Sequence, residues 1–175
     1  MNASPFSYPD PEGLPADLRE RATRPGAFNI VRMMMHTPGL APGFLAMAGD
    51  MLQHNSLPHD WRELAILRVG HTYRAGYEVH HHNRIGRAVG LSEAELEAVT
   101  GDPVEGLTPQ QVTIVHLTDL LLAQHTLTDT QRDEALQVLT VNQLADLVLT
   151  VGFYQMVSNF LNTFGVTPDG EEAAQ

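Results

Sequence analysis

The sequence of 175 residues contains no cysteine and no lysine. Without cysteine, the protein can form no disulfide, no thiolate nucleophile and no zinc site with cysteine ligands. Without lysine, it can form no Schiff base, and a phosphate-binding P-loop would lack its lysine. Several kinds of catalytic site are therefore excluded. Because nothing indicates an oxidising compartment, we expect a cytoplasmic protein.

Positive charge is also scarce, since all ten basic residues are arginine and 21 acidic residues leave a formal net charge of -11. An acidic field disfavours nucleic acid and anionic membrane surfaces. The first residues show neither the apolar run of a secretory signal nor the basic pattern of a transit peptide. The long uncharged stretch 147–166 is interrupted by polar side chains and is more typical of a buried or intersubunit helix than of a membrane span. We therefore expect no nucleic-acid or membrane partner.

Length and composition favour one compact domain. With 43% hydrophobic residues, the chain is long enough for one core and too short to divide comfortably into two. Proline and serine are frequent in residues 1–13, which predicts a flexible arm that is disordered or lies over a neighbouring subunit. We expect a single helical domain over residues 14–168 and a tail at 169–175.

Helical patterns fill the first half of that domain. Apolar residues recur at helical spacing over residues 27–36, 41–54, 61–69 and 77–89. Pro58 suits the first turn of the third segment, and Gly70 is expected to loosen the end of that helix before the chain turns. Gly90 can end the fourth segment in a left-handed cap.

The second half contains four capping boxes, in which a hydroxyl accepts a hydrogen bond from the third helical N–H and a Glu or Gln side chain reaches back. The four pairs are Ser92 with Glu95, Thr108 with Gln111, Thr128 with Gln131, and Thr140 with Gln143. No segment alternates clearly like a strand. The sequence predicts an all-α domain of about eight helices, of which the last runs from Val141 to Phe164 and ends at Gly165.

Three groups that can exchange protons lie on two adjacent apolar segments, where ionisable side chains are costly unless they are paired or used. Glu63 begins the segment 63–69, and Glu78 and His82 lie in the segment 75–82. Glu78 and His82 are four residues apart, so on a helix they share one face. Because apolar residues extend that face, the pair should point inward. We predict that Glu63, Glu78 and His82 form the site.

This arrangement resembles the carboxymuconolactone decarboxylase and alkylhydroperoxidase D superfamily. The pattern is a Glu in an apolar helix, eleven residues, two motif positions separated by two residues, and a His three residues later. The peroxidase branch has cysteine at both motif positions, which are Ala75 and Glu78 in this chain. The decarboxylase branch more often has an aromatic residue, a Glu, three residues and a His, as Tyr77 to His82 does here. The resemblance extends from about Phe28 to Val166.

The resemblance implies an alkylhydroperoxidase D-like helical fold, trimers or hexamers, no cofactor and a small-molecule substrate. It favours a cofactor-free lyase or isomerase that acts on a small organic acid or lactone. In this hypothesis His82, with an ordinary pKa of about 6.5, carries the proton, Glu78 orients it and Glu63 completes a relay. Gly86 would leave room for a ligand. The Tyr77 hydroxyl could bind substrate, although packing is an equal alternative.

Other interpretations of these residues remain open. The cluster could be a structural network, with an arginine such as Arg68 or Arg74. Successive helical residues such as His80, His81 and His82 cannot all face one metal ion. Glu63, Glu78 and His82 could hold a metal, although we favour no metal because nothing supplies a second dedicated ligand motif. An alkylhydroperoxidase-like oxidoreductase is an alternative by family name only, because the redox cysteines are absent. A helical binding or assembly module would keep the fold without catalysis.

The remaining apolar side chains are expected to pack rather than to react. The run Met33 to Met35 is typical of core filler, because adjacent helical residues point in different directions. Trp61, Phe153, Tyr154 and Phe160 are expected in the core or at a subunit interface. Because the last helix is apolar around more than one face, we predict a homo-oligomer.

Overall fold

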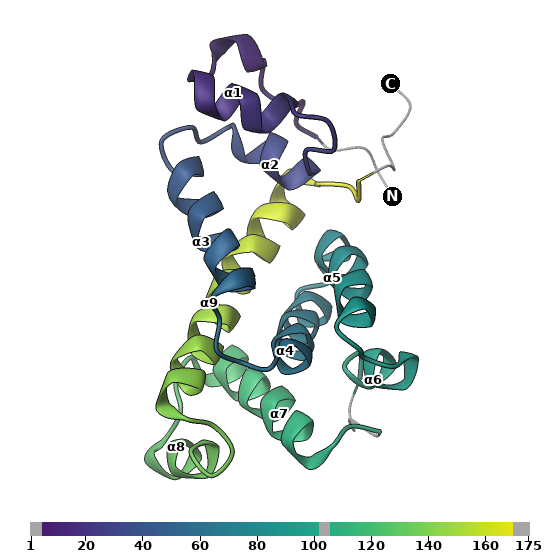
Figure 1. The fold of residues 1–175 in the computed structure, drawn as a ribbon, viewed down its shortest axis with the longest axis vertical. Helices are drawn as coiled ribbons and strands as arrows, with labels where there is room; N and C mark the ends of the chain where they lie inside the picture. The colour runs from purple at the N-terminus through teal and green to yellow at the C-terminus, as the bar shows by residue number, and fades with distance from the viewer. Residues whose placement is uncertain (1–4, 102–105, 170–175) are drawn as a thin grey trace. The chain divides into compact units, whose positions relative to one another are not determined.

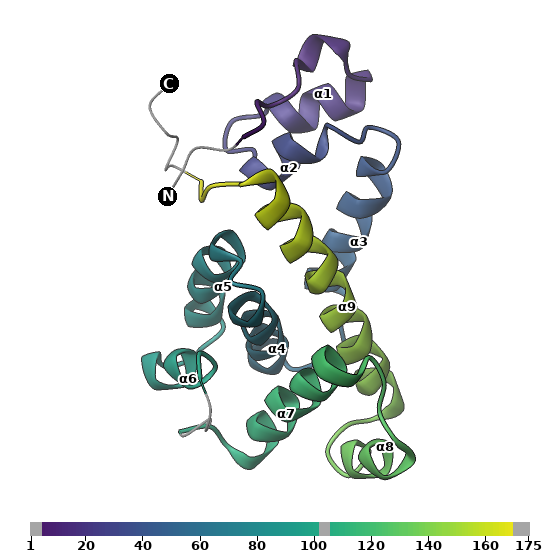
Figure 2. The same cartoon turned by 180° about the vertical axis from the view of Figure 1, so that it is seen from behind.

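The computed structural model of the protein describes residues 5–101 and 106–169. Over these residues the chain forms nine α-helices and one 3-10 helix and contains no strand (Figures 1 and 2). The predicted all-α class is confirmed, with one helix more than the eight expected. The helix without a predicted range is α1 (Ala16–Thr23), which begins after Pro15 with no side-chain cap and buries only Leu18 and Ala22.

The elements are η1 (Pro11–Gly13), α1 (Ala16–Thr23), α2 (Asn29–Met34), α3 (Ala41–Gln53), α4 (His59–Thr72), α5 (Gly76–Ala88), α6 (Glu93–Ala98), α7 (Pro109–Gln124), α8 (Asp129–Ala135) and α9 (Val141–Phe164). The chain divides into two compact units, of which one is Met1–His54 with Phe160–Gln175 and the other is Asn55–Asn159. The division into arm, single domain and tail remains a prediction.

The first unit has its own apolar core. Its buried side chains are Leu14, Leu18, Ala22, Val31, Met35 and Ala41. All three residues of the run Met33 to Met35 are buried, as core filler requires. The described part of the predicted arm also contacts this unit, because the Phe6 ring lies 4.9 Å from the Phe164 ring, centroid to centroid.

The second unit is centred on α4, which packs against α5 and α7. Its main core cluster consists of Leu64, Leu67, Leu91, Leu96, Val99 and Val115. We expected Gly70 to loosen α4, but this prediction is wrong, because the helix continues through Gly70 to Thr72. A Cβ at this position would lie 3.2 Å from Val79 Cγ2 and 3.5 Å from Glu78 Cβ. The glycine therefore allows α4 and α5 to approach closely.

The predicted capping boxes are present at the starts of α6, α7, α8 and α9. In the box of α6, the Ser92 N–H donates to Glu95 Oε2 at 2.8 Å while Ser92 Oγ accepts from the Glu95 N–H at 3.3 Å. The same exchange occurs in the boxes of Thr108, Thr128 and Thr140. The helix starts in this half of the chain are thus specified by neighbouring residues.

The last helix, α9, has the predicted bounds Val141–Phe164, and Gly165 follows it with φ +60°. By length and composition alone α9 could cross a membrane, with 44% of its most apolar window buried. Core helices of soluble proteins pass the same test, so this property is weak evidence for a membrane span.

Candidate functional site

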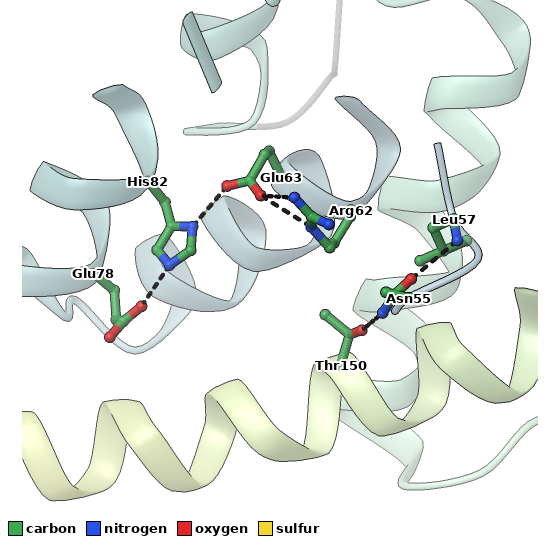
Figure 3. A network of polar contacts seen from close by, with 7 residues as sticks. All are labelled: Asn55, Leu57, Arg62, Glu63, Glu78, His82 and Thr150. Atoms are coloured by element: carbon green, nitrogen blue, oxygen red, sulfur yellow. Dashed lines mark hydrogen bonds and ion pairs between the residues drawn. The ribbon is translucent and has the colours of Figure 1, made fainter. Parts of the chain in front are cut away.

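A hairpin of α4 and α5 in the second unit positions the candidate site (Figure 3). Arg62 and Glu63 lie on α4, and Glu78 and His82 lie on α5. The turn between the helices contains Arg74 in a left-handed conformation with φ +53°, which is uncommon for a residue with a side chain. The four side chains are therefore brought together by one short stretch of sequence.

The start of α4 is fixed by hydrogen bonds within the same unit. Asn55 Nδ2 donates to Thr150 Oγ1 of α9 at 2.9 Å, and the Leu57 N–H donates to Asn55 Oδ1 at 3.0 Å (Figure 3). These bonds tie the segment before α4 to α9. They hold the first turns of α4, which include Arg62 and Glu63, in one place.

Glu63, Glu78 and His82 form a row with the imidazole in the middle (Figure 3). His82 Nδ1 donates to Glu63 Oε2 at 2.6 Å, and His82 Nε2 donates to Glu78 Oε2 at 3.2 Å. The relative exposures of Glu63, Glu78 and His82 are 0%, 4% and 6%. The structure thus brings together the three residues that the sequence analysis selected and buries all of them.

Arg62 is a fourth member of this row that the sequence analysis missed. Its Nε and Nη2 atoms both lie 3.1 Å from Glu63 Oε1. The arginines considered instead lie elsewhere. Arg68 makes a two-pronged ion pair with Asp119 at 2.7 and 2.9 Å, and Arg74 is exposed in the turn. Adjacent helical residues diverge around the axis, so spacing gave no reason to pair Arg62 with Glu63.

The charges in the row alternate in sign. With both carboxylates ionised and His82 protonated, Arg62, Glu63, His82 and Glu78 carry +, −, + and −, so the buried group is neutral. Burial lowers the pKa of His82, but its hydrogen bonds to Glu63 and Glu78 and their negative charges together outweigh burial and raise this pKa to about 9. His82 is therefore an imidazolium at neutral pH.

The row has one open end. Both oxygens of Glu63 accept hydrogen bonds, from Arg62 and His82, whereas Glu78 accepts only from His82, through Oε2. Within residues 5–101 and 106–169, no group donates to Glu78 Oε1. Among the described residues, the row therefore ends at this oxygen.

This geometry does not suit the alternative in which the same three residues hold a metal ion. The two carboxylates bind opposite nitrogens of one imidazole ring, so the three side chains cannot converge on one ion. In the described part of the chain, no group of three or more His, Cys, Asp or Glu side chains could hold a metal.

Two further expectations concerned residues beside the row. Tyr77 is buried, and its ring packs on that of His81 at 4.4 Å between centroids, so its substrate-binding role remains a prediction. Gly86 was expected to leave room for a ligand, but a Cβ there would lie 3.0 Å from Leu96 Cδ2 and 3.2 Å from Leu91 Cδ1. The space beside Gly86 is therefore filled by apolar packing.

Tyr154 of α9 lies against the row, although the sequence analysis placed it in the core or at an interface. Its ring meets the His82 ring edge-on, with centroids 5.1 Å apart and planes at 89°. The contact joins residues far apart in the sequence, so no local pattern could have predicted it.

One segment of the chain matches a known protein family. Residues 38–112 match the carboxymuconolactone decarboxylase family, and this segment contains α4, α5 and all four charged residues of the row. This match supports the predicted resemblance to the carboxymuconolactone decarboxylase and alkylhydroperoxidase D superfamily over that segment. A comparison with curated proteins found no match.

Solved structures share the fold along the whole chain. An uncharacterised peroxidase-related protein from Ralstonia eutropha JMP134, with an alkylhydroperoxidase AhpD core, superposes with a TM-score of 0.84 at 18% identity, covering 100% of both chains. A second peroxidase-related protein, from Silicibacter sp. TM1040, has a TM-score of 0.81 at 16% identity and covers 100% of this chain and 96% of its own. A protein of unknown function from Agrobacterium tumefaciens has a TM-score of 0.71 at 16% identity, covering 79% of this chain and 96% of its own. At these identities the likeness shows the fold alone.

Proposed function

We propose that this protein is a cofactor-free lyase or isomerase that acts by acid–base chemistry on a small organic acid or lactone. The observation that supports the proposal most directly is the buried row Arg62–Glu63–His82–Glu78 with an open carboxylate oxygen at one end. Acid–base catalysis needs a group within reach of the substrate and a partner that stabilises its changing charge. In this proposal, Glu78 is the group within reach of the substrate, and His82 stabilises the changing charge of Glu78.

The proposal assigns each member of the row a role. Glu78 exchanges the proton with the substrate through Oε1, because both ring nitrogens of His82 are already engaged. His82 stabilises the carboxylate form of Glu78 and can supply a proton to it. Glu63, held by Arg62, fixes the imidazole in its orientation. The roles of Glu78 and His82 are therefore exchanged relative to the hypothesis drawn from the sequence.

Two alternatives are less well supported. A peroxidase of the alkylhydroperoxidase type needs a thiolate to attack the O–O bond and a second cysteine to resolve the product, whereas the motif positions hold Ala75 and Glu78. A binding or assembly module would not need four buried charges arranged in a row, since such charges are costly to bury. A binding module is the function to expect if ligands bind to the protein without turnover.

A ligand screen can test the proposal before the substrate is identified. Small lactones and organic acids would first be screened for a rise in the unfolding temperature of the wild-type protein. Each stabilising compound would then be incubated with the protein in D2O and followed by NMR. A lyase that releases CO2 places deuterium on the carbon that loses the carboxylate, and an isomerase places it on the carbon that gains the proton.

The expected result is turnover by the wild-type protein and by Glu134→Gln, which changes an exposed carboxylate on α8. Glu78→Gln should remove turnover, because an amide cannot take up or release the proton at neutral pH. Binding without deuterium incorporation for every stabilising compound would favour the binding module, and equal turnover by Glu78→Gln would contradict the assigned role.

A further inference from the structure

A cavity of about 490 Å³ lies in the first unit, whereas the four residues of the row belong to the second. Its volume falls within the range of about 300–1,000 Å³ that is typical of small-molecule sites. Among the described residues that line the cavity, the ionisable ones are Arg24, Arg32 and Asp169, and the aromatic one is Phe28. The chemistry proposed for the row uses none of them.

The charge of this cavity is opposite in sign to that of the whole protein. Two arginines and one aspartate leave one positive charge in excess among its described lining residues, whereas the chain has a formal net charge of -11. Opposite charges attract most strongly where water is partly excluded. The cavity therefore favours a ligand with a single negative charge.

Arg32 is held in place by contacts within the same unit. Its Nη1 donates to Asn29 Oδ1 at 3.2 Å, and its guanidinium carbon lies 3.8 Å from the centroid of the Tyr8 ring. Asn29 is itself fixed, because it has a relative exposure of 3% and its Nδ2 donates to the Thr167 carbonyl oxygen at 3.1 Å. These contacts orient the guanidinium before a ligand arrives, so binding there costs little side-chain entropy.

Arg24 reaches the cavity from a tight turn. The Ala27 N–H donates to the Arg24 carbonyl oxygen at 3.0 Å, and Gly26 within the turn has φ +75°, which favours glycine. The Arg24 side chain is exposed, and within residues 5–101 and 106–169 it makes no hydrogen bond or ion pair. Its guanidinium is therefore available to a ligand.

Phe28 supplies an apolar surface beside the two arginines. Its relative exposure is 49%, and Ala22 and Ala27 also line the cavity. Covering an exposed aromatic ring with an apolar group is favourable, and a second aromatic ring adds specific packing. The ligand should therefore carry a flat apolar group next to its negative charge.

We propose that this cavity binds a small aromatic monocarboxylate, whose carboxylate pairs with Arg24 and Arg32 while its ring packs on Phe28. A guanidinium group suits a carboxylate because it can present two parallel N–H donors to the two oxygens. Asp169, whose Oδ1 accepts from the Asn29 N–H at 2.6 Å, disfavours a second negative group on the ligand. This inference adds a second site and does not depend on the acid–base function proposed for the row.

An NMR titration of the isotope-labelled protein would compare three probes. Benzoate has a ring and a carboxylate, acetate has the carboxylate without the ring, and benzyl alcohol has the ring without the charge. Benzoate should bind most tightly and should shift the backbone amides of residues 22–32, which include most of the cavity lining. Phe28→Ala should lower the affinity for benzoate to that for acetate, because the ring then loses its partner.

Three variants test the charges. Arg24→Gln should weaken benzoate binding about tenfold, because a hydrogen bond between charged groups is lost. Arg84→Gln, which changes an exposed arginine on α5, is the matched control and should bind like the wild type. Asp169→Asn should strengthen benzoate binding by up to about fivefold, because it removes a like charge from the cavity.

The outcomes decide the inference without reference to turnover. Benzoate shifts that are confined to α4 and α5, equal affinities of Arg24→Gln and Arg84→Gln, or no binding of benzoate would overturn it. Acetate or benzyl alcohol binding as tightly as benzoate would also overturn it, since the site would then recognise only a charge or only a ring. Absence of lyase or isomerase activity would count against the function proposed for the row and leave this inference intact.

Discussion

Raising the pH from 7 to 9.5 should remove the stability that the protein gains from protonated His82. The pKa of this residue is 6.5 when unperturbed and about 9 in the folded protein. A group whose pKa is raised by folding stabilises the native state fully below the unfolded value. That stabilisation is lost as the pH rises through the folded value. The loss should therefore fall between pH 6.5 and about 9.

The expected magnitude follows from the size of the pKa rise. Each pKa unit corresponds to about 1.4 kcal/mol, so the rise from 6.5 to about 9 corresponds to about 3 kcal/mol. The groups that face His82 are Glu63 on α4, Glu78 on α5 and Tyr154 on α9, with Arg62 behind Glu63. Tyr154 has a raised pKa and contributes only near and above pH 10. The change in the free energy of unfolding between pH 7 and 9.5 therefore reports mainly on His82.

Urea unfolding followed by circular dichroism would measure the free energy of unfolding at several pH values and one protein concentration. The wild-type protein should lose about 2 kcal/mol between pH 7 and 9.5, because part of the stabilisation is already lost between pH 6.5 and 7. His82→Gln has no imidazole at this position to titrate and should lose much less, while His54→Gln, which alters an exposed histidine, should follow the wild type. NMR of the imidazole gives a direct check. A His82 resonance that titrates at or below pH 6.5, or identical pH profiles for wild type and His82→Gln, would refute the reasoning.

Four other outcomes are expected. Arg62→Met should destabilise the protein by about 3–5 kcal/mol in urea unfolding, because Glu63 loses a buried counter-charge, whereas Arg87→Met, at an exposed ion pair, should have little effect. Gly70→Val should lower the free energy of unfolding by about 1–3 kcal/mol, because α4 and α5 touch there, and an unchanged value would contradict the close approach. Light scattering at micromolar concentration should give an oligomer, and a monomeric mass would count decisively against the apolar surface of α9 as an interface. Assays with a dithiol and a hydroperoxide should show no turnover by metal-free protein, because the chain has no thiol.

The parts of the fold that could be predicted depend on neighbouring residues. The boxes at Ser92, Thr108, Thr128 and Thr140 specify helix starts locally, and the structure contains all four. The spacing of Glu78 and His82 likewise places both on one face of α5, where they meet. By contrast, α1 begins without a side-chain cap, so it lacked the signal that marked the later helices.

The parts that could not be predicted depend on contacts across the fold. A glycine such as Gly70 can either end a helix or allow a neighbouring helix to approach closely. Only the position of α5 shows which of the two applies. Arg62 reaches Glu63 through the conformation of its side chain, which residue spacing does not determine. Tyr154 joins the row only because α9 passes α5 in the folded chain.

The four charged residues of the row and Tyr154 come from different parts of the chain. One continuous hairpin, from His59 to Ala88, supplies all four charges, and it lies within the segment that matches the carboxymuconolactone decarboxylase family. The tyrosine comes from α9, beyond that segment. Mutations in α9 can therefore alter what contacts the row while the hairpin keeps its four charges. A lineage with this architecture can change the surroundings of the row without having to assemble the charged residues again.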